Sequence, residues 1–425
     1  MNTRISAAIL MLTIICAQSS AATFQGAGTL GGVSLFRSEC WGVSGDGSIA
    51  YGSSPATGGG FAFRWNASTG IQSLGDLPGG HTKSYALNAS YDGSVIVGTS
   101  YTTDSGGHQV HRAYTWTKAT GMKELPLPED PFYTDFATCA FAISADGRTA
   151  VGLAGRTDSL FWDYSRLLIW DLQASTPPSA HRLPYEPFTY AQFADASASA
   201  AVILIVGATD LLWTNESGFH ETVPGAMALS GDGSTILGAR PFFGEPRYDD
   251  SFVWTQETGC RFIGTIDGFV SNHASAISHD GSIVVGTLFN DIMQHQDHAA
   301  YLWTEHDGVR LIQDILENDC GLDLDGWILT NASGISYDGR TIVGNGINPE
   351  GYEEGWIATL PACSLRADLT GDCTVDIYDL LEFANQWLAT SQDTPCPLTA
   401  DLAGQDCNVN LKDFATLATE WLQQQ

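Results

Sequence analysis

The chain is poor in positive charge. It has 18 Lys and Arg residues against 48 Asp and Glu residues, which gives 425 residues a formal net charge of −30 at pH 7. Such a surface repels nucleic acid and anionic membrane surfaces. The composition therefore excludes a nucleic-acid partner, and it fits both calcium ligation and solubility outside the cell.

Long apolar runs are also missing. A membrane-spanning helix needs about 20 apolar residues, and the apolar stretch from Ile5 to Cys16 is shorter. It follows the charged Arg4 and leads to small residues ending at Ala22, which is the pattern of a secretory signal peptide. We therefore expect a signal peptide over residues 1–22, no membrane span, and a protein exported to the outside or surface of a bacterial cell.

Familiar catalytic motifs are missing as well. The sequence contains no Gly-x-Ser-x-Gly nucleophile turn, no His-Glu-x-x-His zinc motif and no phosphate-binding loop. Glycosidases need two carboxylates about 5–10 Å apart, and nothing in the sequence pairs any two of its loop acids. His295 and His298 could ligate a metal, but their spacing suits a helix where a loop is expected, so packing is favoured.

A short phrase recurs along most of the chain. It reads Ser-x-Asp-Gly, followed by a β-branched run and, about twenty residues later, an aromatic-x-Trp. The copies begin at Ser44, Ser90, Ser144, Ser230, Ser278 and Ser336. The longest gap lies between the copies at Ser144 and Ser230. It leaves room for a degenerate copy over Ala196–Gly207. A repeat of this length indicates a propeller or a solenoid.

Each repeat contains four short apolar runs, and Asp-Gly between the first two is a strong hairpin signal. Four antiparallel strands per repeat are typical of a propeller blade. The sequence thus predicts a mainly β fold, a seven-bladed β-propeller of four-stranded blades over residues 23–361. The last repeat is one strand short, and Thr23–Gly32 resembles the missing strand, so the first segment should complete the last blade. The repeated tryptophans should pack between blades. They are Trp65, Trp116, Trp170, Trp213, Trp254, Trp303 and Trp356.

Residues 23–361 resemble the HAF-type extracellular repeat proteins. The matching residues include His111–Trp116 and His298–Trp303, which approach the repeat tryptophan in the manner of that family. The resemblance implies an exported β-propeller and no common reaction. The uniform Asp-Gly hairpins should lie on one face and the long, varied loops on the other, where function usually resides. The candidate ligand residues on that loop face are His108, Phe242, Phe243, Arg247, Tyr248 and His295.

The C-terminal residues 362–425 hold two acidic loops, each followed by an amphipathic helix. The helices are expected over Asp379–Leu388 and Asp413–Leu422. Calcium takes oxygen ligands at positions 1, 3, 5, 7, 9 and 12 of such loops. In the first loop these are Asp368, Thr370, Asp372, Thr374, Asp376 and Asp379. In the second loop the candidates are Asp401, Asp406, Asn408, Asn410 and Asp413, with one extra residue and no oxygen ligand at position 3, so that site should be weaker.

This duplicated arrangement resembles a type I dockerin, a small α-helical calcium-binding module. The resemblance implies two bound Ca²⁺ ions and docking onto a cohesin-like domain. It also implies that the residues just before position 12 take part in docking; here they are Ile377, Tyr378, Leu411 and Lys412.

Cysteine usage fits an exported protein. Eight cysteines remain after the signal peptide, and an even count outside the cell suggests disulfides. Four of them lie in the C-terminal module, where three connectivities are open. The symmetric pairing Cys363–Cys373 and Cys396–Cys407 is our hypothesis. The pairing of Cys40, Cys139, Cys260 and Cys320 is left open by the sequence.

Three functions are consistent with these features. The first is a non-catalytic binding protein, whose propeller recognises a glycan or a protein and whose tail tethers it through calcium to a cohesin-like or cell-surface partner. The second is a polysaccharide-degrading enzyme, a glycoside hydrolase or lyase with its site on the loop face. The third is a structural surface component with no specific ligand. The absence of a catalytic constellation favours the first.

Overall fold

The computed structural model describes residues 21–31, 38–103, 106–127, 136–156, 163–174, 179–182, 191–207, 209–240, 250–290, 298–361, 367, 369, 375, 377–391, 398–403 and 407–421. The chain divides into two compact units, one of residues 22–360 and one that contains residues 361–425. None of the helices in these described ranges is long and apolar enough to cross a membrane. The predicted signal peptide lies outside the described residues, apart from its last two positions.

The larger unit is made of β-strands that pair antiparallel in groups of four. One eight-stranded sheet contains β2 (Glu39–Val43), β3 (Ala50–Ala56), β4 (Gly59–Asn66), β5 (Gly70–Gly75), β6 (Gly79–Ala89), β7 (Val95–Thr103), β8 (Gln109–Thr117) and β9 (Gly121–Glu124). Its two halves meet through a single pair, Gly60 with Lys83.

A second eight-stranded sheet is built the same way. It contains β10 (Phe136–Ile143), β11 (Thr149–Arg156), β12 (Asp163–Asp171), β13 (Ser179–Arg182), β14 (Ala191–Ala196), β15 (Val202–Gly207), β16 (Leu211–Thr214) and β17 (Gly218–Glu221). Among the described residues, its halves are joined between β12 and β14 by the pair Tyr164 and Ala191.

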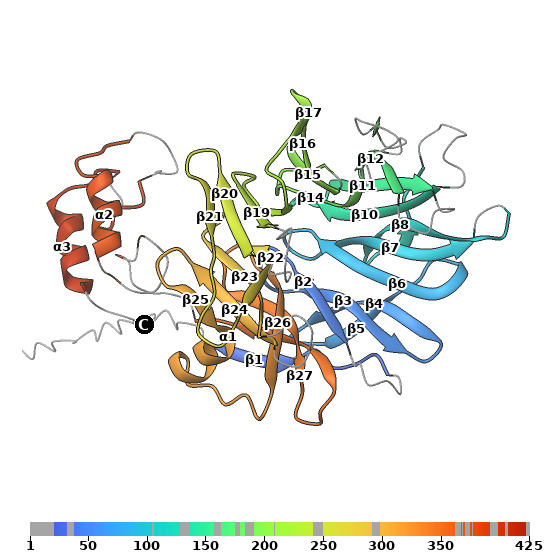
Figure 1. Cartoon of the computed structure of the whole chain (residues 1–425), viewed down its shortest axis with the longest axis horizontal. Helices are drawn as coiled ribbons and strands as arrows, with labels where there is room; N and C mark the ends of the chain where they lie inside the picture. The colour runs from blue at the N-terminus through green and yellow to red at the C-terminus, as the bar shows by residue number, and fades with distance from the viewer. Residues whose placement is uncertain are drawn as a thin grey trace, which may run out of the picture. The chain divides into compact units, whose positions relative to one another are not determined.

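Three further sheets have four strands each. The first holds β18 (Ala226–Leu229), β19 (Thr235–Arg240), β20 (Asp250–Thr255) and β21 (Gly259–Phe262). The second holds β22 (Ser271–Ile277), β23 (Ile283–Phe289), β24 (His298–Thr304) and β25 (Gly308–Leu311). The third holds β26 (Ile328–Ile335), β27 (Thr341–Ile347), β28 (Glu353–Thr359) and β1 (Thr23–Gly26). The sheets fan around a common centre (Figure 1).

The first strand completes the last sheet, as the sequence predicted. β1 pairs antiparallel with β28 in the register Thr23 with Thr359 to Gly26 with Trp356. The Glu354 carboxylate secures the junction, since it accepts the Gly28 N–H at 2.9 Å and the Asn348 side-chain amide at 2.7 Å. This pairing covers the edge of β28, which would otherwise expose unpaired backbone groups. The unit is therefore a closed β-propeller.

The Ser-x-Asp-Gly phrase forms the turn between the first two strands of its group. At Ser44, the hydroxyl donates to the Asp46 carboxylate at 2.7 Å and accepts the Ile49 N–H at 3.0 Å. The same Asp46 oxygen accepts the Ser48 N–H at 2.9 Å. Gly47 has φ of +74°, the left-handed conformation that glycine adopts without strain. The repeated aspartates are thus turn residues, as expected.

These turns are also linked to one another in a ring. In each turn, the N–H of the first or second residue after the serine donates to the carbonyl of the residue after the serine in the neighbouring group. The bonds run from Asp46 N to Tyr91 O, Tyr91 N to Ala145 O, Ala145 N to Ala198 O, Ala198 N to Gly231 O, Asp232 N to His279 O, His279 N to Tyr337 O and Tyr337 N to Gly45 O. The last of these bonds, from Tyr337 N to Gly45 O, is 2.9 Å long and closes the circuit at the first turn. Ala198 belongs to the degenerate copy, which therefore keeps its place in the ring without Asp-Gly.

The repeated tryptophans occupy matching positions in the third strands and are buried or partly buried. Trp356 on β28 is fully buried, and Trp170 on β12 is 2% exposed. Trp170 also donates its indole N–H to the Pro126 carbonyl at 2.8 Å, across the boundary between two sheets. These side chains pack in the core, which is the role that the sequence predicted.

Two features of this unit differ from the sequence prediction. A helical insertion, α1 (Ile312–Asp314) and η2 (Ile315–Asp319), lies between β25 and β26 and buries Ile312, Ile315 and Leu316 in the core. The four cysteines of the propeller are free thiols, so the disulfides that the even cysteine count suggested are wrong here: Cys40 and Cys139 are buried, Cys320 is half-buried and Cys260 is exposed.

The smaller unit contains two helices, α2 (Ile377–Asn385) and α3 (Leu411–Glu420). Each starts two residues before the predicted position, and α2 ends three residues before Leu388. Phe383 and Leu417 are buried with Ala367, Val375, Ala400, Leu402 and Val409 in a core separate from that of the propeller. Trp387 and Leu388, which fall within the predicted helix, lie after the end of α2 and are 40% and 68% exposed.

Candidate functional site

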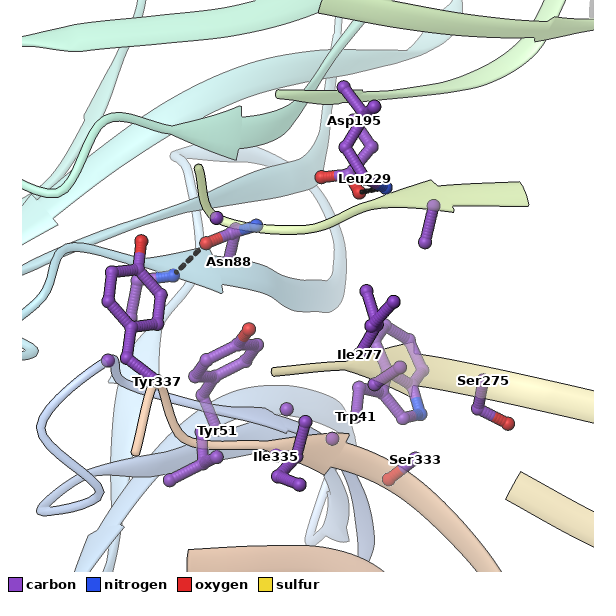
Figure 2. A pocket seen from close by; sticks show the side chains of 18 of the residues that line it. Trp41, Tyr51, Asn88, Asp195, Leu229, Ser275, Ile277, Ser333, Ile335 and Tyr337 are labelled. Carbon is purple, nitrogen blue, oxygen red and sulfur yellow. Dashed lines mark hydrogen bonds between the residues drawn. The ribbon is translucent and has the colours of Figure 1, made fainter. Parts of the chain in front are cut away.

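A cavity of about 200 Å³ lies at the centre of the propeller. It is lined by the first strand of every four-stranded group, β2, β6, β10, β14, β18, β22 and β26, and by residues of the turns. Figure 2 shows its polar side chains, which include Asn88, Asp195, Ser275 and Ser333. A site built from every sheet in this way is held rigidly by the whole unit.

The lining strands bulge at a matching point. In β2, β22 and β26 the register shifts at Trp41, Ser275 and Ser333, three residues before the turn serine. A bulge leaves one residue unpaired and redirects its side chain. All three bulged residues line the cavity.

Asp195 on β14 is the one carboxylate among the lining residues that the structure describes, and Lys, Arg and His are absent from that lining. Its Oδ1 accepts the Ala196 N–H at 2.8 Å, and its Oδ2 accepts the Leu229 N–H of β18 at 2.9 Å. Burial raises the pKa of Asp195 above its ordinary value, and the two N–H groups oppose that effect only in part.

Two phenols face the same cavity. Figure 2 shows Tyr51 and Tyr337 side by side at one end of it. Tyr51 passes over Gly42, where any Cβ would collide with its phenol oxygen, so the glycine admits the ring. Burial raises the pKa of Tyr337, and the nearby Asp195 carboxylate raises it further. The same two causes raise the pKa of Tyr51, so both phenols are neutral hydrogen-bonding groups at pH 7.

Aromatic side chains continue from the cavity over the surface of β6, β7 and β8. The Trp41 ring stacks on Tyr85 with centroids 5.3 Å apart and planes 19° apart. The Lys83 Nζ lies 5.5 Å from the Tyr85 ring centroid and 5.7 Å from that of Tyr101. The Tyr101 and His111 ring centroids are 3.8 Å apart. We call Trp41, Lys83, Tyr85, Tyr101 and His111 the aromatic track.

The aromatic track carries one positive charge at neutral pH. Burial lowers the pKa of His111 to about 4, and the Lys83 ammonium lowers it too. The Lys83 pKa is raised, first by the hydrogen bond and charge of Tyr85. The track therefore combines neutral ring faces with a single ammonium, and Lys83 itself is exposed to solvent.

Of the residues predicted for the ligand face, the structure describes His108. It is exposed in the connection between β7 and β8, the hairpin whose strands also carry Tyr101 and His111. The other predicted residues, Phe242, Phe243, Arg247, Tyr248 and His295, lie outside the described residues.

The cavity residues were missed by the sequence reasoning. Asp195 stands two residues before the turn serine position of the degenerate copy. The corresponding residues of the other copies are Gly42, Asn88, Ala142, Ala228, Ala276 and Gly334. An alignment of the repeats on their serines would have singled out the only ionisable side chain at this position. The stacking of Trp41 on Tyr85 has no such signal, because it joins two copies in space.

In the C-terminal unit, the two helices carry equivalent buried aspartates. Asp379 and Asp413 are both fully buried, and each accepts a backbone N–H from its own loop at 2.7 Å, from Leu369 and Ala403 respectively. Asp413 also accepts the Asn410 N–H at 2.8 Å, and Asn410 caps α3 through the Lys412 N–H. The sequence duplication is thus a structural one.

Asp401, at position 1 of the second loop, has an oxygen that the described residues leave unsatisfied. Its Oδ2 accepts the Cys407 N–H at 2.7 Å, whereas Oδ1 is buried without a hydrogen-bond partner. Asn408, which follows Cys407 in the chain, is exposed. An orphaned buried carboxylate oxygen is costly unless a cation or donor satisfies it, so the second loop fits a bound cation at this atom.

Most of the predicted ligands of the first calcium loop, one of the second loop and three of the cysteines lie outside the described residues. They are Asp368, Thr370, Asp372, Thr374, Asp376, Asp406, Cys363, Cys373 and Cys396. Within the described residues, His, Cys, Asp and Glu side chains form no group of three that could hold a metal ion. The disulfide pairing and the two calcium sites stay predictions.

The residues predicted to dock a partner lie at the start of each helix. Ile377 is 59% exposed and Leu411 is 72% exposed, and Lys412 follows on α3. The backbone of Tyr378 belongs to α2. Leu381 and Phe414, one turn further along their helices, are also exposed. Ile377 and Leu411 hold equivalent positions, two residues before Asp379 and Asp413, so each helix begins with an exposed apolar side chain, whereas Leu381 and Phe414 are not equivalent to each other.

No protein-family model matches the chain, and no curated protein matches it. Among solved structures, it is similar to an oligogalacturonate lyase in complex with manganese, with a TM-score of 0.48 and 13% identity, covering 81% of this chain and 98% of that one. It is similar to an oligogalacturonate lyase from Vibrio parahaemolyticus (TM-score 0.47, 13% identity, 80% and 97% covered). It is also similar to the β-propeller domain of the Trilobed protease from Pyrococcus furiosus (TM-score 0.46, 11% identity, 73% and 89% covered).

Proposed function

We propose that the chain is an exported, non-catalytic glycan-binding protein. Its four-stranded groups make a seven-bladed propeller of HAF type, which binds the glycan. Its dockerin-like tail holds calcium and tethers the protein to a cohesin-like or cell-surface partner. The observation that supports glycan binding best is the aromatic track, which runs from the central cavity to the predicted loop face.

The chemistry of the track suits sugar rings. A sugar presents an apolar face and a rim of hydroxyls, and it packs on aromatic side chains while the hydroxyls bind polar groups. Tyr85 and Tyr101 supply rings beside the Lys83 ammonium, and Trp41 links them to the hydrogen-bonding groups of the cavity. The described lining holds a single carboxylate, whereas glycoside hydrolysis uses two, and this favours binding over turnover.

Glycan binding is tested with the full chain on a panel of soluble polysaccharides, by titration calorimetry and by product analysis. We expect saturable binding without new reducing or unsaturated ends. The double variant Tyr85→Ala, Tyr101→Ala should lose at least tenfold in affinity, and Phe262→Ala, which removes an exposed ring on β21 of another sheet, should not. Turnover of any polysaccharide would support the enzyme instead, and binding equal in both variants would remove the track from the site.

The tail is proposed to bind two Ca²⁺ ions, one in each loop. Asp401, Asp406, Asn408, Asn410 and Asp413 would hold the ion of the second loop, with the orphaned Asp401 Oδ1 as a ligand. A calcium ion there would be the cationic partner of this oxygen. It would also hold the loop against the start of α3. The exposed apolar side chains of α2 and α3, including Ile377 and Leu411, would then form the docking surface.

A calcium titration of the full chain tests this proposal. The wild type should bind two ions, and Asp401→Asn should bind one, because the second loop loses a carboxylate while the first is untouched. Asp267→Asn, an exposed acid of the propeller, is the matched control and should still bind two. Two ions bound by Asp401→Asn would contradict the assignment of this residue, and no binding by the wild type would remove the calcium-dependent tether.

A further inference from the structure

We propose that the central cavity binds the ammonium group of a small ligand, held against the Asp195 carboxylate. This inference rests on the proposed function only in taking the propeller as the ligand-binding unit. In that setting it names the class of sugar that the cavity accepts, an amino sugar.

The charge of the cavity is the first reason. Asp195 is the one carboxylate of the described lining, and the described lining offers it no Lys, Arg or His. Asp195 is half-buried, and a carboxylate partly withdrawn from water without a cation is energetically costly. The equivalent positions on the first strands of the other groups carry neutral residues, such as Asn88 and Ala228, so the turn-and-bulge architecture does not require an acid there.

The hydrogen bonds of Asp195 leave room for a ligand. Its two oxygens each accept one backbone N–H, from Ala196 and from Leu229. A carboxylate has about four acceptor positions, so each oxygen keeps one for a donor from the cavity. The hydrogen bond from the Leu229 N–H also ties β14 to β18. That structural role needs only the Asp195 Oδ2 atom as an acceptor and does not need a charged carboxylate.

Aromatic rings and hydroxyls surround the same space. Trp41, Tyr51 and Tyr337 line it together with Asp195 (Figure 2). Cations are attracted to the faces of aromatic rings, most strongly where water is excluded. Ser275 and Ser333 add hydroxyls that can accept from an N–H or donate to a sugar oxygen. A carboxylate with aromatic walls is the combination that binds organic ammonium ions.

The volume of the cavity and the negative charge of Asp195 limit the ligand further. Its volume of about 200 Å³ is below the ~300–1,000 Å³ common for ligand pockets, so it admits one small group rather than a chain. A uronate or a phosphate would place negative charge beside Asp195, and no described lining residue would neutralise it. The cavity therefore discriminates by charge among sugars of similar size.

A ligand series on the unmodified full chain tests the proposal. Binding of glucosamine, N-acetylglucosamine and galacturonate is measured by calorimetry at a pH where the glucosamine amine is protonated. We expect glucosamine to bind at least tenfold tighter than N-acetylglucosamine, which keeps the ring but has no charge, and galacturonate to bind weakest. Equal binding of the first two would overturn the proposal.

Two variants locate the charge. Asp195→Asn should weaken glucosamine binding at least tenfold and abolish the preference for glucosamine over N-acetylglucosamine. Asn88→Asp places a second carboxylate at the equivalent position of β6 and should strengthen glucosamine binding. If Asp195→Asn loses its cooperative unfolding, the Asn88→Asp variant and the ligand series decide. Glucosamine affinity that is the same in wild type, Asn88→Asp and a folded Asp195→Asn would place the ligand elsewhere and overturn the inference.

The outcomes separate this inference from the proposed function. Polysaccharide binding that depends on Tyr85 and Tyr101, with no preference for an ammonium group, would uphold the proposed function and refute the cavity's selectivity. Glucosamine binding that depends on Asp195, in a protein that binds no polysaccharide, would uphold the cavity site and refute the glycan-binding role.

Discussion

At the scale of single residues, Ser90 illustrates how the repeated turns are held. It is 1% exposed, donates to Asp92 at 2.9 Å and accepts the Val95 N–H at 3.1 Å. Ser90→Ala leaves that N–H without its side-chain acceptor, so we expect a loss of about 1–3 kcal/mol of unfolding free energy. Urea unfolding measures it. Ser199→Ala, in the exposed turn of the degenerate copy, is the control and should change stability by less than about 0.5 kcal/mol.

The turn aspartates also predict the response to acid. The hydrogen bonds of Ser94 lower the pKa of Asp92, and those of Ser144 lower the pKa of Asp146. A carboxyl whose folded pKa is depressed stabilises the fold above its unfolded pKa of about 3.9 and loses this contribution as pH falls through the folded pKa. Unfolding free energy should therefore fall below about pH 4. The double variant Asp92→Asn, Asp146→Asn should show a shallower fall, and an unchanged slope would contradict this cause.

The free cysteines predict an order of chemical modification. Cys40 and Cys139 are buried, and burial raises the pKa of both thiols, which suppresses the reactive thiolate. A thiol reagent should modify the exposed Cys260 first in the native protein, and Cys40 and Cys139 only after unfolding. Mass spectrometry of timed samples reads the order. Rapid labelling of Cys40 without unfolding would contradict the buried position.

At the scale of elements, β1 is the strand on which closure depends. A chain that begins at residue 27 lacks β1 and exposes the edge of β28, whereas a chain that begins at residue 22 keeps it. We expect the shorter chain to unfold at a temperature at least several degrees lower and to aggregate, because unpaired strand edges recruit other chains. Thermal unfolding and light scattering test this. Equal melting of the two chains would mean that β1 adds little to the propeller.

The elements also show what sequence reasoning reaches. Asp-Gly turns, the third-strand tryptophans and the pairing of β1 with β28 follow from local pattern, because each copy repeats the same physical solution. The helical insertion at Ile312–Asp319 was missed, since it occurs once and breaks the period. The cavity was missed because Trp41, Asp195 and Tyr337 come from different copies, and only the closed arrangement brings them together.

At the scale of the whole molecule, two separate cores predict two unfolding events. Within the part of the chain that the structure describes, the core around Phe383 and Leu417 shares no residue with those of the propeller. A ligand that binds only the folded form stabilises the unit that holds it. Calcium should therefore raise the melting temperature of the smaller transition by calorimetry and leave the larger one in place, and Asp401→Asn should reduce that shift. A shift of the propeller transition alone would place calcium outside the tail.

The pairing of Thr23 with Thr359 also sets an order in time. Ribosomes add about 5–20 residues per second, so the strand that is made first waits roughly 20–70 s for its partner. Until then neither the last sheet nor the circuit of turns that returns to Gly45 can close. A propeller that stays open for that long can still pass through a narrow channel as an extended chain. Its first and last strands, β1 and β28, pair only after the whole propeller sequence has been made.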